Sequence, residues 1–106
     1  MARVTHAMTD PEILVELGRR LRAYRLQQNL PIKELSKQAG MSPLTLQKTE
    51  RGHNFTIGTL VRVLRALGRL EQLDAVLPEP SLSPLALLAQ QRRSPRRRAR
   101  RRAHGG

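Results

Sequence analysis

The chain has 106 residues and a net charge of +12, from 20 Lys and Arg against 8 Asp and Glu. This length fits one small domain, and the absence of cysteine excludes disulfides, thiolate metal sites and a cysteine nucleophile. Only Tyr24 and Phe55 are aromatic, so the core has to be built from Leu, Val, Ile and Ala. We therefore predict an all-α protein, a compact helical bundle.

The basic charge is concentrated at one end of the chain. All eight acids precede Arg92, whereas residues 92–106 contain eight arginines and no acid. A basic balance of this kind favours nucleic acid as a partner. No apolar run approaches the length of a membrane span, and residues 1–10 lack the apolar core of a signal peptide. We expect no membrane association and a cytoplasmic location, on the bacterial nucleoid when the protein is bound to DNA.

Residues 1–8 show no periodic pattern and are predicted to form a flexible arm. The first helix is expected to begin just after Thr9, because Thr9 and Glu12 have capping-box spacing and Pro11 suits the first turn. It is expected to end at Gln28 and Asn29. Its apolar residues recur at helical spacing: Leu14, Leu17, Leu21 and Tyr24.

Residues 32–52 indicate two short helices joined by a tight turn. In the first, 32–39, Leu35 and Ala39 lie one turn apart, and Gly40 supplies the positive φ that often ends a helix. Ser42 is a favoured N-cap for the second, 43–51, and Pro43 fits its first position. From pattern alone, an ordinary helical hairpin is the alternative interpretation.

Two more helices complete the predicted domain, residues 9–77. Thr56 is the expected N-cap of a helix over 57–67, and a fifth helix is expected over 70–76. Residues 78–91 are predicted to be a proline-containing linker, stiffened by Pro78 and Pro80, followed by a short helix from Ser83 to Gln91. Residues 92–106 cannot bury apolar surface, and we predict a disordered Arg-rich tail.

The order of apolar, small, turn and capping residues along the two central helices resembles the helix-turn-helix of the lambda-repressor/Cro (XRE) class. The resemblance covers about 17–67 and implies a lambda-repressor-like five-helix fold, with 43–51 as the recognition helix. The residues that carry it are Leu35, Ala39, Gly40, Met41, Ser42, Leu46, Glu50, Arg51 and Gly52. It also implies that Arg25 pairs with Glu50, and it places Thr49 at a core position. The Thr49 hydroxyl then has to bond a backbone carbonyl one turn back.

The resemblance implies double-stranded DNA as the partner, with the third helix in the major groove. Its expected outward face carries Pro43, Leu44, Gln47 and Lys48. Gln47 suits an adenine edge, Lys48 a guanine edge or a phosphate, and Leu44 a thymine methyl group. Family members often have polar residues where Pro43 and Leu44 stand. The expected phosphate contacts come from Thr45 and from residues near helix N-termini or after the third helix: Lys33, Ser42, Arg51, His53 and Asn54.

The whole layout resembles the HipB-like antitoxins that accompany HipA-like kinase toxins. This implies a sequence-specific repressor that binds a palindromic operator as a homodimer, represses its own operon and binds the toxin. The residues concerned are Leu73, Leu77, Pro78, Pro80, Ser83, Pro84, Leu85 and Leu88. The alternatives are a stand-alone or phage-type repressor, a protein-interaction module with degenerate DNA reading, and a nonspecific Arg-rich nucleic-acid binder.

No catalytic constellation is present in the sequence. The histidines His6, His53 and His104 lack the spacing of metal ligands, and no nucleophile stands beside a base. We therefore expect no enzymatic activity, no cofactor and no metal.

Overall fold

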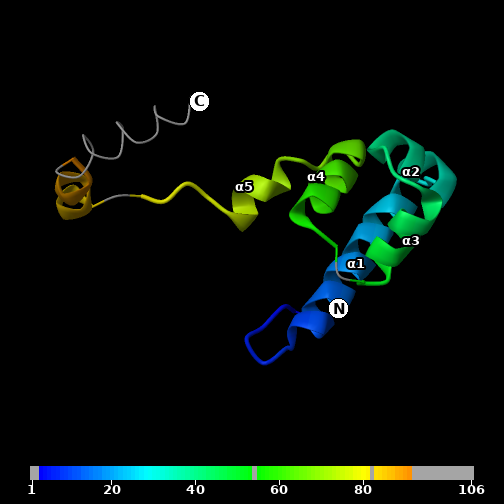
Figure 1. Cartoon of the computed structure of the whole chain (residues 1–106), viewed down its shortest axis with the longest axis horizontal. Helices are drawn as coiled ribbons and strands as arrows, with labels where there is room; N and C mark the ends of the chain where they lie inside the picture. Colours follow the sequence, from blue (N-terminus) through cyan, green and yellow to red (C-terminus); the bar gives the residue numbers. More distant parts are fainter. Residues whose placement is uncertain (1–2, 54, 82, 92–106) are drawn as a thin grey trace, which may run out of the picture. The chain divides into compact units, whose positions relative to one another are not determined.

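A computed structural model describes residues 3–53, 55–81 and 83–91. Within these residues the secondary structure is helical and includes no strand, which confirms the all-α prediction. The helices are α1 (Asp10–Gln27), α2 (Ile32–Ala39), α3 (Pro43–Glu50), α4 (Ile57–Ala66) and α5 (Gln72–Val76), with a further helix at 84–91 (Figure 1). The chain divides into two compact units between Leu73 and Asp74. The predicted disorder of 92–106 lies outside the described residues.

Three of the helices begin at the side-chain caps that the sequence predicts. Thr9 forms a capping box with Glu12: the Glu12 amide donates to Thr9 Oγ1 at 3.2 Å, and the Thr9 amide donates to Glu12 Oε1 at 2.8 Å. Ser42 Oγ accepts from the Thr45 amide at α3, and Thr56 caps α4 in the same way. These bonds satisfy amides that have no partner within the helix.

The first four helices all end in the same way. A residue with positive φ follows each one, and two backbone bonds close the last turn, as in the Schellman motif. After α2, for example, the Gly40 amide donates to the Lys37 carbonyl and the Met41 amide to the Ser36 carbonyl. The residues with positive φ are Asn29, Gly40, Gly52 and Gly68. The chain therefore reverses sharply after each helix, which packs the four helices into a small bundle.

The core of the first unit is aliphatic, as the composition requires. α3 packs against α1 and α2, and α2 also packs against α4. Leu35 of α2, Leu46 of α3 and Val63 of α4 are fully buried at the centre. The remaining buried members of the core cluster are Leu21, Leu64 and Leu67. Each of the helices α1 to α4 thus contributes at least one buried side chain, and burial of this shared apolar surface stabilises the bundle.

Two glycines allow the end of α3 to lie directly on the backbone of α1. A Cβ atom at Gly18 would lie 2.6 Å from the carbonyl oxygens of Thr49 and Glu50. A Cβ atom at Gly52 would collide with the backbone of Val15, and Gly52 also has a φ of +84°. Only glycine fits such close backbone contacts, so α1 and α3 are locked at short range.

An ion pair buried between α1 and α3 confirms the expected partnership of Arg25 and Glu50. Arg25 Nε donates to Glu50 Oε2 at 2.8 Å, and Nη2 donates to Oε1 at 3.1 Å. Arg25 Nη1 donates to the Leu30 carbonyl at 2.8 Å. The two side chains are only 8% and 5% exposed. The bidentate geometry fixes both the separation and the rotation of α3 relative to α1.

Thr49 occupies a core position on α3 and is 2% exposed. Its Oγ1 donates to the Thr45 carbonyl one turn earlier at 2.9 Å. This is the bond that the sequence analysis requires, because a buried hydroxyl without a partner is destabilising. With its hydroxyl bonded in this way, Thr49 can pack its methyl group in the core.

Replacing Glu50 with alanine should destabilise the domain by about 3–5 kcal/mol, because Arg25 would be left charged and buried without its partner. For a domain of this size, that corresponds to a melting temperature lower by more than about 10 °C. Thermal unfolding followed by circular dichroism measures the change, with Glu71→Ala as the control because Glu71 is exposed. A Glu50→Ala melt within a degree or two of the parent would show that the pair does not stabilise the fold.

Candidate nucleic-acid interface

One side of α3 is exposed and carries both polar and apolar side chains. We call this side the recognition face, and it consists of Pro43, Leu44, Gln47 and Lys48. All four side chains are exposed, and Leu44 is 57% exposed. The opposite side of α3 carries the buried residues Leu46, Thr49 and Glu50. Because one side is fixed in the core, the other side has a defined orientation, as an α-helix in a DNA groove requires.

The recognition face has the chemistry for contacts to base edges. The Gln47 amide can donate and accept, so it suits the N6 and N7 atoms of adenine. The Lys48 ammonium only donates, which suits guanine acceptors or a phosphate oxygen. Leu44 offers apolar contact for a thymine methyl group, whereas Pro43 contributes ring surface and no N–H. The set therefore contains two groups that can form hydrogen bonds with bases and two apolar groups that can only pack.

Ser42 and Thr45 form a small hydroxyl pair at the start of α3. Ser42 Oγ accepts from the Thr45 amide, and the two hydroxyl oxygens lie 3.0 Å apart. One hydroxyl donates to the other, so the second keeps its proton for an outside acceptor. Both residues are exposed, and the helix N-terminus adds positive potential. This is a suitable environment for the predicted phosphate contacts.

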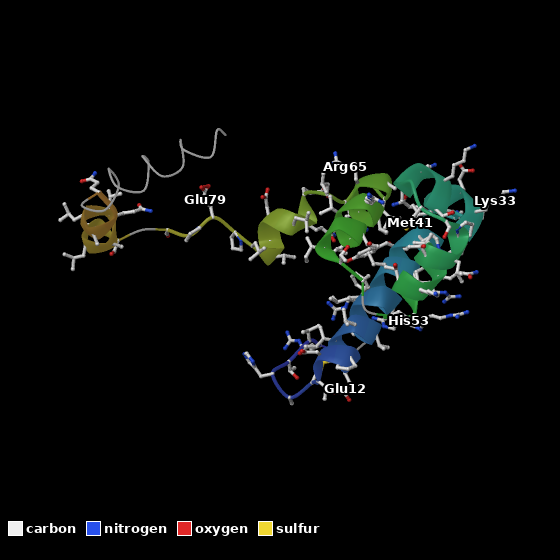
Figure 2. The ribbon with its side chains drawn as sticks, viewed as in Figure 1. Glu12, Lys33, Met41, His53, Arg65 and Glu79 are labelled. Carbon is white, nitrogen blue, oxygen red and sulfur yellow. The ribbon has the colours of Figure 1, made fainter. Side chains whose placement is uncertain are left out.

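The other predicted phosphate contacts lie on α2 and just after α3. Lys33 is exposed in the first turn of α2 and His53 is exposed just after α3 (Figure 2). Arg51, also exposed, directly follows the last residue of α3. The His53 amide donates to the Lys48 carbonyl, so this turn has a defined backbone position. Asn54 lies outside the described residues. Lys33 and Arg51 add exposed positive charges at the start of α2 and directly after α3.

The structure also shows a hollow that the sequence analysis missed. It has a volume of about 260 Å³ and lies where α1, the start of α2 and α3 come together. Its lining residues are Arg22, Arg25, Ile32, Gln47, Glu50 and Arg51. The only sequence feature that points to this hollow is the spacing of Arg22 and Arg25, which are three residues apart and therefore share a side of α1.

Other arginines of α1 are already engaged. Glu16 accepts from Arg19 Nε and Nη2 at 3.1 and 2.8 Å and from Arg20 Nε at 2.8 Å. These hydrogen bonds, first that of Arg19 and then that of Arg20, lower the pKa of Glu16 from 4.5 to about 2. Glu16 is therefore ionised at neutral pH and compensates part of the charge of Arg19 and Arg20.

Residues 3–53, 55–81 and 83–91 contain no group of three His, Cys, Asp or Glu side chains that could bind a metal ion. In the same ranges, no helix is both long and apolar enough to cross a membrane.

Comparison with known proteins agrees with this geometry. Residues 21–72 match the family model described as Helix-turn-helix. The match covers slightly less than half of the chain, from the second half of α1 to the first residue of α5. Comparison with curated proteins gave no match. The matched segment is similar to helix-turn-helix domains of the XRE type, and this match supports a DNA-binding transcription regulator as the class of this protein.

Gln47→Ala should weaken binding to the preferred duplex by about 1–3 kcal/mol and leave binding to random DNA nearly unchanged. The reason is that the Gln47 amide would contact a base edge that only the preferred sequence supplies. The preferred duplex is first selected from a random pool, and affinities are measured by fluorescence anisotropy. Gln27→Ala, an exposed change on α1, is the control. Equal losses on both duplexes would exclude Gln47 from base recognition.

Proposed function

We propose that this protein is a sequence-specific repressor that binds a palindromic operator as a homodimer. The observation that supports it is the recognition face itself: Gln47 and Lys48 are exposed on a helix whose other side is fixed by the Arg25–Glu50 pair. A helix that does not contact bases would not need an exposed side held in a fixed orientation. An occupied operator excludes the transcription machinery, so binding alone is sufficient for repression.

Exposed apolar side chains support the homodimer. In dimeric helix-turn-helix proteins, the two recognition helices lie about 34 Å apart, which is one turn of DNA. Of the apolar residues expected on the fifth helix, Leu70 and Leu73 pack against the core, whereas Val76 is 64% and Leu77 82% exposed. Val76 and Leu77 are therefore the residues of this set that a second protomer would cover. Leu73 is unsuitable as a test position, because its replacement also disturbs the core.

Leu77→Asp should shift the protein from dimer to monomer and weaken binding to the palindrome more than to a half-site, because it places a charge in the proposed interface. Analytical ultracentrifugation measures the mass. Leu26→Asp is the matched control, since Leu26 is 47% exposed on α1. If the variant dimerises as strongly as the parent, the interface lies on another surface, such as the helix at 84–91.

We further propose that the protein is an antitoxin that binds a HipA-like kinase toxin through the helix at 84–91. This helix contains no charged residue. Its leucines are exposed: Leu85 by 79%, Leu87 by 45% and Leu88 by 50%. A helix this short is marginal in water on its own. Docking on a partner would stabilise it, and Leu85 and Leu88 are among the residues that carry the resemblance to the antitoxins.

The antitoxin proposal predicts that the adjacent reading frame encodes a kinase whose growth arrest is relieved by this chain. Leu85→Asp combined with Leu88→Asp should abolish both relief and co-purification while leaving operator binding intact. Gln90→Asp, on the same helix, adds a charge without removing a leucine and serves as the control. If no kinase is encoded there, the protein is a stand-alone repressor. If the double variant still binds the kinase, the helix at 84–91 is not the binding surface.

The Arg-rich tail, 92–106, lies outside the described residues, and its role is a separate prediction. Each phosphate neutralised steepens the plot of log affinity against log salt by about 0.9. Truncation after Gln91 should therefore flatten this slope by several units and weaken binding to operator and random DNA alike. The ratio of the two affinities should persist, since base recognition belongs to α3. An unchanged slope would assign the arginines to an acidic surface on a protein partner instead.

A further inference from the structure

The hollow between α1, α2 and α3 has a surplus of positive charge. Three guanidinium groups line it, from Arg22, Arg25 and Arg51, against one carboxylate, that of Glu50. Glu50 is already compensated, because each of its oxygens accepts a bond from Arg25. The charges of Arg22 and Arg51 are therefore left over, and both side chains line the same hollow.

Neither surplus charge is compensated within the described residues. Among residues 3–53, 55–81 and 83–91, Arg19, Arg20 and Arg25 form ion pairs with acids, and Arg22 and Arg51 do not. Both of these side chains are exposed. An anion in the hollow would compensate these two charges.

The buried arginine contributes donors as well as charge. Arg25 has five N–H groups, and three of them bond to Glu50 and to the Leu30 carbonyl. One N–H on each terminal nitrogen remains, on a side chain that lines the hollow and is almost inaccessible to bulk water. The ligand chemistry that suits three guanidinium groups is a phosphate, which accepts forked hydrogen bonds from arginine.

We propose that the hollow is a phosphate site that binds one phosphate group of the DNA backbone, with Arg22 and Arg51 as its two arms. This rests on the proposed DNA-binding function and adds Arg22, on α1, to the interface. Gln47 belongs both to the hollow and to the recognition face. A phosphate seated in the hollow therefore lies beside the base that Gln47 contacts, and it fixes the register of α3 along the groove.

The test is the salt dependence of binding to a random duplex. Arg22→Gln should flatten the plot of log affinity against log salt by about 0.9 for each protomer bound. Arg22→Lys, which keeps the charge, should restore most of the slope. Arg65→Gln, on the last turn of α4 and outside the hollow, removes the same charge and should leave the slope nearly unchanged (Figure 2). Arg22→Gln should not lower the melting temperature, since Arg22 is exposed and forms no ion pair among the described residues.

A second measurement locates the phosphate on the selected duplex. A neutral methylphosphonate is placed at each backbone position in turn, and the parent should lose affinity at a position next to the base contacted by Gln47. Arg22→Gln should show no further loss at that same position, because the contact is already gone. Full, additive losses there, or a slope that falls equally for Arg22→Gln and Arg65→Gln, would overturn the proposal.

A third measurement separates DNA phosphate from a free one. Inorganic phosphate is titrated into the DNA-free protein while the side-chain Nε–H signals of Arg22 and Arg51 are followed by NMR. For a site that binds the DNA backbone, we expect weak binding of inorganic phosphate, with signal shifts that appear only at millimolar concentrations. Tight binding of inorganic phosphate, together with an unchanged DNA salt slope in Arg22→Gln, would make the hollow a free-phosphate site and contradict the proposal. A parent that binds no duplex would refute the proposed function itself.

Discussion

The buried ion pair of Arg25 and Glu50 is the interaction on which the arrangement of the domain depends. It joins the last turn of α1 to the last turn of α3 through two charged hydrogen bonds. Arg25 is also tied to the turn that follows α1: its Nη1 donates to the Leu30 carbonyl, and its own carbonyl accepts from the Leu30 amide. One residue thus determines where α1 ends, how the chain enters α2 and how α3 is rotated.

A pair of this kind contributes more to geometry than to net stability. Burying two charges costs free energy that the pair only partly recovers, and an apolar replacement of both residues is often no less stable. An aliphatic contact, however, permits rotation and sliding that two directional bonds do not. The backbone contacts at Gly18 and Gly52 act in the same sense, since they leave no space between α1 and α3. Together these features orient the recognition face, which a DNA-binding helix requires.

Much of the fold follows from local chemistry along the chain. Thr9, Ser42 and Thr56 cap helices as their side chains predict, and the helix boundaries agree to within two residues. α3 and α4 each end one residue earlier than expected, and α5 begins two residues later, because Arg51, Leu67, Leu70 and Glu71 lie in turns. The resemblance supplied the Arg25–Glu50 pair, whose members are far apart in sequence.

Features that arise only from packing were not predictable. Gly18 looks like an ordinary helical glycine until α3 is placed against it. Arg22 looks like one of several arginines on α1, and only the structure shows that Glu16 engages Arg19 and Arg20 while Arg22 lines a hollow. Arg69 lies 3.9 Å from the ring centroid of Tyr24, a cation–π contact between residues 45 positions apart that no local pattern indicates. The exposure of the recognition face was predictable, because helical periodicity separates its residues from Leu46, whereas the core position of Thr49 came from the resemblance.

The most direct test of this account is a double-mutant cycle across the ion pair. Arg25→Met, Glu50→Met and the double variant are compared with the parent by urea unfolding. We predict that each single change is strongly destabilising and that the double variant recovers much of the loss, which gives a coupling of more than about 1.5 kcal/mol. Single losses that simply add in the double variant, within about 0.5 kcal/mol, would contradict the claim that this pair fixes α3 on α1.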